Sequence, residues 1–282
     1  MNKIDFILLF DAVDANPNGD PDAGNMPRQD AETCHGIVTD VCLKRKIRNY
    51  VQLTRNNEPP YEIYVRENAI LNRQQQRSYT ALETEGAKPT PEEAKAWMCR
   101  NFYDIRTFGA VMSTGGTVCN CGQVRGPVQL SFARSYDPVI PAEIAVTRCA
   151  VTKEEDAKKE RTMGRKYTIP YALYMVKGTV NPFLATQTGF EESDLELLIE
   201  SLIHMFDFDA SAARPAGSMA VRKLILFRHS SQLGNAPAHK LYEALKVARK
   251  SGVESPRCVA DYDILIDSAV VPEGITIEEI NC

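Results

Sequence analysis

Residues 11–30, DAVDANPNGDPDAGNMPRQD, and residues 39–51, TDVCLKRKIRNYV, indicate the fold more clearly than any other part of the chain. They follow residues 3–11, where apolar side chains alternate from Ile4 to Phe10 and then occupy both faces, a pattern typical of a central strand. On a helix over residues 39–51, one apolar stripe comprises Leu43, Ile47, Tyr50 and Val51. The sequence therefore predicts a buried strand, a loop of small and polar residues, and a helix that packs while presenting cations on an adjacent face.

Positive charge is concentrated beside this loop, although the whole chain has a formal net charge of −4. Between residues 28 and 55 there are six basic and three acidic residues, whereas from Glu254 onward seven acidic residues face one arginine. A local basic face binds phosphates even on an acidic protein. Nucleic acid is thus the first partner to consider, and the acidic end could meet a basic surface on a neighbouring copy.

Length and composition predict a globular cytoplasmic protein. With 282 residues and 44% hydrophobic content, the chain can bury a sizeable core as one large domain or one domain with insertions. No apolar run reaches the roughly 18 residues that a membrane helix needs. The N-terminal apolar segment meets Asp11 and Asp14 instead of a small-residue cleavage site, so we expect a strand and no signal peptide.

The cysteines and histidines do not form a recognisable metal site or disulfide framework. Of the eight cysteines, six are scattered, and the pair in Cys119-Asn120-Cys121 lacks the two-residue spacer of a zinc knuckle. The four histidines show no HExxH pattern. We therefore expect reduced thiols, no metal and no cofactor.

The remaining segments predict an ordered series of elements. Residues 55–103 resemble an insertion in which Thr90-Pro91-Glu92-Glu93 forms a capping box that opens a helix. Residues 106–113 and 127–137 have strand composition and predict a hairpin with a long loop. Residues 142–171 have strand-like ends and a polar middle, which is typical of a projecting hairpin or arm.

The last third of the chain completes the pattern. Ser193-Asp194-Leu195-Glu196 predicts a second capping box, residues 220–230 and 262–268 predict strands, and residues 238–250 predict an amphipathic helix. Without its insertions the order is strand, helix, strand, strand, helix, strand. This is the order of an α+β, ferredoxin-like fold, in which helices cover one face of an antiparallel sheet as in RNA-recognition modules.

Five motifs carry a family resemblance. In order along the chain they are NPNGDPDAGNMPRQD (residues 16–30), GIVTDVCLKRKIRNYV (36–51), TMGRKYTIPYALY (162–174), MFDFDASAARPAGSM (205–219) and FRHSSQLGNAP (227–237). Together they closely resemble the backbone subunit of type I-C CRISPR Cascade complexes, the Cas7 family. The resemblance covers essentially the whole chain, and its first motif is long and ungapped.

The resemblance implies a right-hand-like subunit with an RNA-recognition-type palm. By mapping, the palm takes residues 1–55, 101–143 and 168–282, an inserted helical fingers region takes residues 56–100, and a thumb hairpin takes residues 144–167. Such subunits polymerise along a CRISPR RNA, and each thumb displaces a base so that the segmented guide pairs with target DNA. The implied partners are other copies, the guide-processing and large subunits, and a recruited helicase-nuclease. No catalysis is implied.

A subunit that accepts any guide needs phosphate contacts, close backbone approach and apolar wedges instead of contacts to base edges. Lys44, Arg45 and Arg48 are the predicted phosphate ligands, with a solvated helix face as the alternative. Lys46 falls on a different face. In the first loop (residues 16–30), Asn16 and Asn18 would shape a turn that presents amide groups, with Arg28 adding charge; a self-capped Asx turn without a ligand is the alternative.

Further candidates lie in three other segments. Gly115 and Gly116 belong to a Gly-rich loop that lacks the lysine of a P-loop and either approaches RNA or is a plain hairpin loop. In the thumb, Met163 is the predicted wedge. The cations predicted at flanking phosphates are Arg148, Arg165 and Lys166. Arg214 is predicted at RNA or at a subunit contact, with a structural salt bridge as the alternative.

Two rival functions are carried forward. The first-loop aspartates Asp20, Asp22 and Asp30 could support a metal-dependent ribonuclease, although such a cluster is also ordinary turn chemistry and no general acid is evident. Magnesium dependence separates this function from a scaffold, because phosphate binding by Lys and Arg needs no divalent ion. A small-molecule enzyme on the same fold is a further alternative, but the sequence shows no nucleophile paired with a general base to support it.

Overall fold

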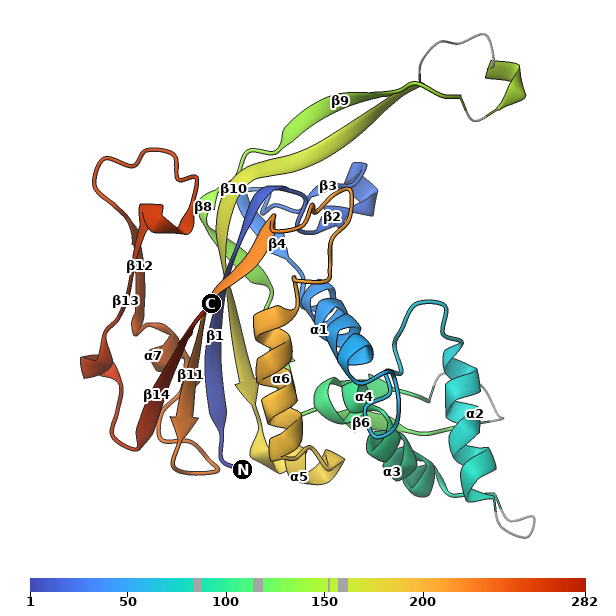
Figure 1. The fold of residues 1–282 in the computed structure, drawn as a ribbon. Coiled ribbons are helices and arrows are strands. Elements are labelled where there is room, and N and C mark those ends of the chain that lie inside the picture. The colour runs from blue at the N-terminus through green and yellow to red at the C-terminus, as the bar shows by residue number, and fades with distance from the viewer. Residues whose placement is uncertain (84–87, 114–118, 152, 157–161) are drawn as a thin grey trace.

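The computed structural model describes residues 1–282 except 84–87, 114–118, 152 and 157–161, and is built on one large antiparallel sheet (Figure 1). The sheet has eight strands, and its main path runs β14 (Ile275–Asn281), β11 (Met219–His229), β1 (Ile4–Ala15), β10 (Thr162–Val180), β8 (Ala133–Pro138) and β4 (His35–Val38). Two further strands, β7 (Val128–Leu130) and β9 (Ala142–Arg148), also pair with β10. The mixed α/β class with an antiparallel sheet agrees with the sequence prediction.

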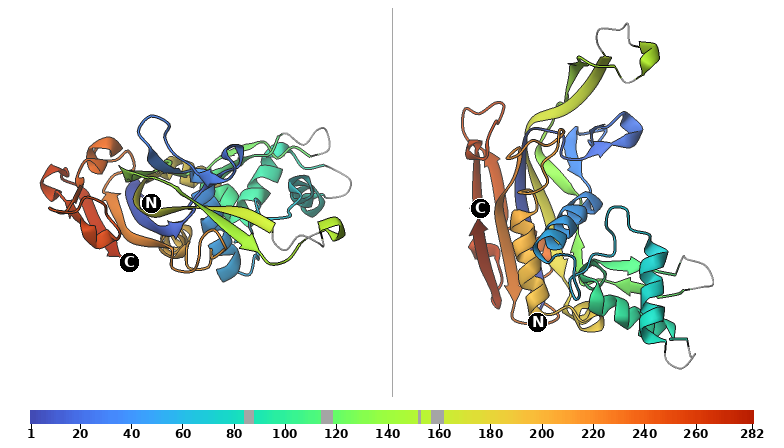
Figure 2. Two further views of the ribbon diagram at one scale, coloured as in Figure 1. Left: turned by 90° about the horizontal axis from the view of Figure 1, so that it is seen from above. Right: turned by 45° about the vertical axis from the view of Figure 1, so that its right-hand side comes forward.

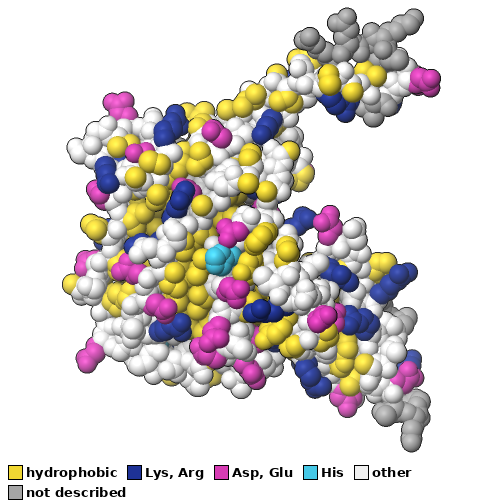
Figure 3. Space-filling view, in the orientation of Figure 1, with side chains coloured by type: hydrophobic (Ala, Val, Ile, Leu, Met, Phe, Trp, Pro, Cys, Tyr) yellow, Lys and Arg dark blue, Asp and Glu magenta, His cyan; other side chains and the backbone are white. Residues whose placement is uncertain are grey.

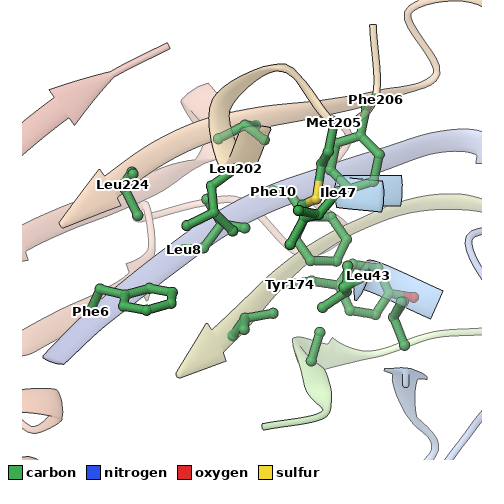
Figure 4. Close-up of a cluster of buried hydrophobic side chains, with 14 of the residues drawn as sticks. Phe6, Leu8, Phe10, Leu43, Ile47, Tyr174, Leu202, Met205, Phe206 and Leu224 are labelled. Carbon is green, nitrogen blue, oxygen red and sulfur yellow. The ribbon is translucent and has the colours of Figure 1, made fainter. Parts of the chain in front are cut away.

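Strand β1 lies at the centre and is buried on both faces, as predicted. Its neighbours are β10, with Ile4 opposite Val180, and β11, with Ile4 opposite Arg228. Phe6, Leu8 and Phe10 pack with side chains of α1 (Asp40–Thr54) and α6 (Glu192–His204), among them Leu43, Ile47 and Leu202 (Figure 4). Alternation along the strand sends Ile7 and Leu9 to the opposite face, where α7 (Ala238–Tyr242) packs. The sheet is therefore covered on both sides.

A second core lies beside the sheet in the side lobe, which we define as residues 61–125. It contains α2 (Leu71–Leu82), α3 (Pro91–Asn101), α4 (Tyr103–Phe108), β5 (Gly109–Val111) and β6 (Gln123–Arg125). The predicted capping box is confirmed, because Thr90 Oγ1 accepts from the Glu93 amide and Glu93 accepts from the Thr90 amide.

Two buried ion pairs join the side lobe to the helices that cover the sheet. Arg48 Nε of α1 lies 2.8 Å from Asp104 Oδ2, and Arg106 makes a two-pronged contact with Asp194 of α6. Removing one partner of a buried pair leaves the other charge without compensation. These pairs therefore fix how the side lobe sits on α1 and α6.

The predicted hairpin between residues 106–113 and 127–137 is wrong. Residues 106–108 complete α4, because the Arg106 side chain is buried against Asp194, and β5 then pairs with β6 inside what was expected to be a loop. Residues 127–137 instead contribute β7 and β8, which pair with β10. Local composition identified strand-forming residues but not their partners.

Three expectations near the C-terminal end also need correction. The helix predicted over residues 238–250 stops at Tyr242, and β12 (Leu245–Arg249) pairs with β13 (Tyr262–Ile266) in a separate two-stranded sheet. Strand β14, which was not predicted, fills the edge beside β11. The second capping box uses Glu191 and Asp194, since the Asp194 carboxylate accepts from the Glu191 amide, so α6 begins at Glu192.

The remaining elements are short. They are β2 (Gly19–Asp20), β3 (Met26–Pro27), α5 (Pro182–Thr188) and four 3-10 turns at Pro21–Ala23, Glu154–Asp156, Val259–Asp261 and Ser268–Val270. Within the described part of the chain, no helix is long and apolar enough to cross a membrane.

Candidate nucleic-acid interface

A two-stranded arm projects from the sheet (Figures 1 and 2), which confirms the hairpin predicted over residues 142–171. We define the arm as residues 142–168. Strand β10 is 19 residues long, and its first part pairs with β9 from Thr162 to Thr168, whereas Ile169 begins the pairing with β1. Because one strand runs from the buried sheet into the arm, the rigid core sets the arm's direction.

One face of the arm carries Met163 and Arg165. Residues opposite each other on paired strands point to the same side, so Met163 shares this face with Thr147, and Arg165 shares it with Ala145. The Met163 side chain is 73% exposed, and Arg165 Nη1 lies 2.8 Å from Glu143 Oε1. An exposed methionine beside a guanidinium held by a carboxylate offers an apolar contact next to a positive charge.

The other face of the arm combines apolar side chains with cations. Ile144 and Val146 are exposed, and Lys166 lies opposite Ile144. Arg148, at the end of β9, donates from Nε to the carbonyl of Ala150 at 2.8 Å. The arm thus carries all four residues predicted from the sequence, with Met163 and Arg165 on one face and Arg148 and Lys166 on the other. Their contact with RNA stays a prediction.

The first loop is held by its own asparagines. Asn16 is buried and donates from Nδ2 to the carbonyl of Asn25 at 2.7 Å, and Asn18 Oδ1 accepts from the amide and hydroxyl of Thr39 at 3.0 and 3.1 Å. Strands β2 and β3 close the loop with Gly19 opposite Pro27. The side chains therefore shape the loop, as in the alternative of a self-held turn. RNA contact by these residues remains untested.

Asp20 and Asp22 belong to one turn of the first loop, beside Arg28, and Asp30 belongs to another. Arg28 is half-buried and 3.5 Å from Asp20, which also caps the turn at Asp22. Asp30 accepts from Arg134 and from the amides of Thr33 and Glu32, and these hydrogen bonds hold the pKa of the Asp30 carboxyl well below its usual value. No group of three potential metal ligands occurs among the described residues.

The cations of α1 differ in how they are used. Lys44 pairs with Asp40 at 2.9 Å and lies over the Phe108 ring, and Arg48 approaches the same ring while it pairs with buried Asp104. Arg45 is 67% exposed, and its Nη2 lies 3.7 Å from Glu67 Oε2. This is a long contact between two exposed side chains, so the ion pair is weak. Of the three predicted phosphate ligands, Arg45 is therefore the most accessible. The role of all three stays a prediction.

A partly buried charge cluster that sequence reasoning missed connects α1 to the segment of residues 205–218. Asp209 Oδ2 accepts from Arg214 Nε at 2.9 Å and from the buried Lys46 Nζ, and Arg214 Nη1 also donates to the carbonyl of Asn16 at 3.4 Å. Burial lowers the pKa of Lys46. Arg214 therefore makes the structural salt bridge that was the alternative, and its contact with RNA or a neighbouring subunit stays a prediction. Gly115 and Gly116 lie outside the described residues.

The sequence matches one family model over residues 2–267, and that family is described as CRISPR-associated protein Cas7. A curated relative, the CRISPR-associated protein Cas7 of Haloferax volcanii, is 26% identical over 220 residues, which cover 70% of this chain. The matched region spans 62% of the relative's own length.

Two solved structures share the fold. A chain of a CRISPR RNA-guided surveillance complex in a pre-nicking state has a TM-score of 0.51 and 13% identity, covering 84% of this chain and 80% of that chain. A chain of another CRISPR RNA-guided surveillance complex has a TM-score of 0.50 and 14% identity, covering 90% of this chain and 78% of its own length. At this level of identity the likeness concerns the fold alone.

Proposed function

The chain belongs to the CRISPR-associated protein Cas7 family, and on this premise we propose that it is a non-catalytic CRISPR RNA-binding backbone subunit of a type I-C Cascade surveillance complex. It polymerises along the guide RNA and segments the guide for pairing with target DNA in antiviral defence. The observation that carries this proposal is the projecting arm, which presents an exposed Met163 with Arg165 beside it.

The palm of this subunit is a ferredoxin-like module. The strand order β11, β1, β10, β8, with α1 and α6 packed on one face of that sheet, supports this assignment. The fingers comprise residues 56–100, and the core that they share with β5 and β6 supports treating these strands as part of the same unit. The thumb comprises residues 144–167.

The guide RNA runs past the thumb and the first loop. A protein that binds every guide sequence must read the backbone, so its cations contact phosphates while an apolar side chain separates neighbouring bases. Met163 is the wedge, and Arg148, Arg165 and Lys166 hold the adjacent phosphates. Arg45 adds a further phosphate contact from α1. Weak pairing to Glu67 leaves its guanidinium available for exchange to a phosphate.

The partners follow from this function. They are the CRISPR RNA, the target DNA strand paired to it, further copies of the chain, the guide-processing and large subunits, and a recruited helicase-nuclease, all in the cytoplasm. Target degradation belongs to that recruited enzyme. The separate hydrogen-bonding roles of Asp20 and Asp30 in turns support a structural part for the first loop.

The test uses labelled single-stranded RNA mixed with the purified chain, with magnesium or with a chelator, while complex size and RNA integrity are followed. Large complexes on intact RNA, equal under both conditions, are the expected result. Cleavage that requires magnesium and is lost in Asp20→Asn or Asp22→Asn would replace the scaffold by the ribonuclease.

A further inference from the structure

An acidic surface covers the outer side of α6. Glu192, Glu196 and Glu200 follow one another at intervals of four residues, so they lie on one side of the helix, and Asp207 continues the surface beyond its end. Phe208 adds an aromatic ring that is 69% exposed. Among the described residues, Glu192 and Glu196 have no ion-pair partner. Figure 3 shows the row of acidic side chains over this part of the molecule.

A basic surface lies on the side lobe, on the segment that enters α2. Arg66 and Arg73 are exposed, and within the described part of the chain neither forms an ion pair. Between and beside them are Val65, Ile70 and Leu71, which are 44%, 51% and 40% exposed. Apolar side chains grouped in this way beside cations are typical of an interaction surface.

The two surfaces match each other in chemistry. Each has exposed apolar area beside charges that are mostly of one sign. Arg55 pairs with Glu200 on the acidic surface, and Glu67 lies next to Arg66 on the basic surface, but the net signs of the two surfaces are opposite. They lie on separate parts of one molecule, the acidic surface over α6 and the basic surface on the side lobe (Figures 1 and 2). A chain that carries two different complementary surfaces can associate head to tail, which produces an open array.

We propose that the acidic surface of one copy binds the basic surface of the next, and that this contact holds neighbouring copies in register along the guide. The inference rests on the proposed function, because it names the surfaces through which the backbone subunit assembles. The acidic surface would repel a phosphate backbone, so a protein surface is the occupant that its charge favours. A second copy is the partner whose complementary surface is already present.

In this contact the apolar side chains supply most of the affinity, and the charges supply most of the specificity. Phe208 on one side and Ile70 with Leu71 on the other supply the apolar area that is removed from water. The opposed charges are exposed, so they mainly speed association and select the register, and their effect falls with salt. Reversing the sign of one surface should therefore weaken assembly strongly at low salt, while reversing both surfaces should restore it.

The experiment uses three charge-reversal variants of the full chain. The first is Glu192→Lys with Glu196→Lys, the second is Arg66→Glu with Arg73→Glu, and the third carries all four substitutions. Matched controls make the same change in net charge on exposed residues elsewhere: Glu254→Lys with Asp263→Lys, and Lys240→Glu with Lys246→Glu. Each protein is titrated onto a short single-stranded RNA that holds one copy and onto a long one, and complex size is measured.

We expect each single-surface variant to bind the short RNA like its matched control but to need about tenfold more protein than that control to fill the long RNA at low salt. The four-substitution variant should fill it at close to the wild-type concentration. Equal filling by all variants would overturn the contact and leave the proposed function intact. Failure of the wild-type chain to bind either RNA would overturn the proposed function and this inference with it.

Discussion

The cations of α1 and the cations of the arm look alike in the sequence but differ in the structure. On α1, Lys44 and Arg48 lie against Phe108 and pair with Asp40 and Asp104, so they are largely withdrawn from solvent. On the arm, Arg165 is 69% exposed and pairs with the exposed Glu143. A basic run on a packed helix can thus be part of the framework, whereas a basic run on a projecting hairpin is available to a partner.

The difference arises from what lies opposite each segment. Helix α1 is packed between the sheet and the side lobe, where the buried carboxylate of Asp104 requires a positive charge. The arm extends beyond both cores, and residues 143–148 are all exposed. Burial forces ion pairs to form inside the molecule, and exposure leaves only weak ones that a ligand can replace.

The largest effect should come from removing the carboxylate that holds α1 to the side lobe. Asp104 accepts from Arg48 Nε and from the amides of Tyr64 and Val65. In Asp104→Ala these three donors lose their partner, so the free energy of unfolding should fall by about 3–5 kcal/mol. Chemical denaturation followed by circular dichroism measures this change. A loss below about 1 kcal/mol, the usual size for a surface pair, would place Arg48 among the available cations.

The next largest effect should appear in RNA affinity and not in stability. Replacing Arg148, Arg165 and Lys166 together by Glu should weaken binding to single-stranded RNA by about one to two orders of magnitude at low salt, because three charged contacts to phosphate become repulsive. The slope of log affinity against log salt should flatten by about 0.7 for each lost phosphate contact. The free energy of unfolding should change by no more than about 0.5 kcal/mol. A fall in stability with unchanged RNA affinity would mean that the arm cations belong to the framework and are not available to RNA.

Elements with strong local signals were predictable from the sequence. The alternating apolar residues of β1 and the capping box at Thr90 identify their elements without knowledge of any neighbour. Pairing between strands was less accessible, because β5 is too short to carry a pattern and its partner β6 lies in a segment without regular alternation. The same limit applies to β12, which was mistaken for the continuation of a helix.

The candidate site shows the same division. Composition indicated the arm and its exposed residues, because a polar segment between two strand-like ends has few ways to be buried. The partners of the α1 cations were out of reach, since Asp104 is 56 residues from Arg48 and Asp209 is 163 residues from Lys46. Only the tertiary structure shows that these carboxylates meet the helix.

A third prediction compares single residues of α1. Arg45→Ala should weaken RNA binding about threefold to tenfold with little change in stability, because its pairing to Glu67 is loose and exposed. Arg48→Ala should instead lower stability, since it leaves Asp104 buried without its cation. Binding is measured by fluorescence anisotropy and stability by thermal unfolding. If both substitutions weakened RNA binding equally and left stability equal, Arg45 and Arg48 would both act as phosphate ligands, as the sequence predicted.

The smallest effect concerns the first loop and its dependence on pH. The pKa of Asp30 is lowered in the folded state by hydrogen bonds from Arg134, Thr33 and Glu32, so its contribution to stability is present above the unfolded pKa near 3.8 and is lost as pH falls through the folded value. Wild type should therefore be slightly more stable than Asp30→Asn at pH 7, and the difference should shrink below about pH 4. Denaturation at pH 7, 5 and 3 measures it. A difference that grows on acidification would mean that the Asp30 carboxyl is held protonated, and the loop would then belong with the buried framework of α1.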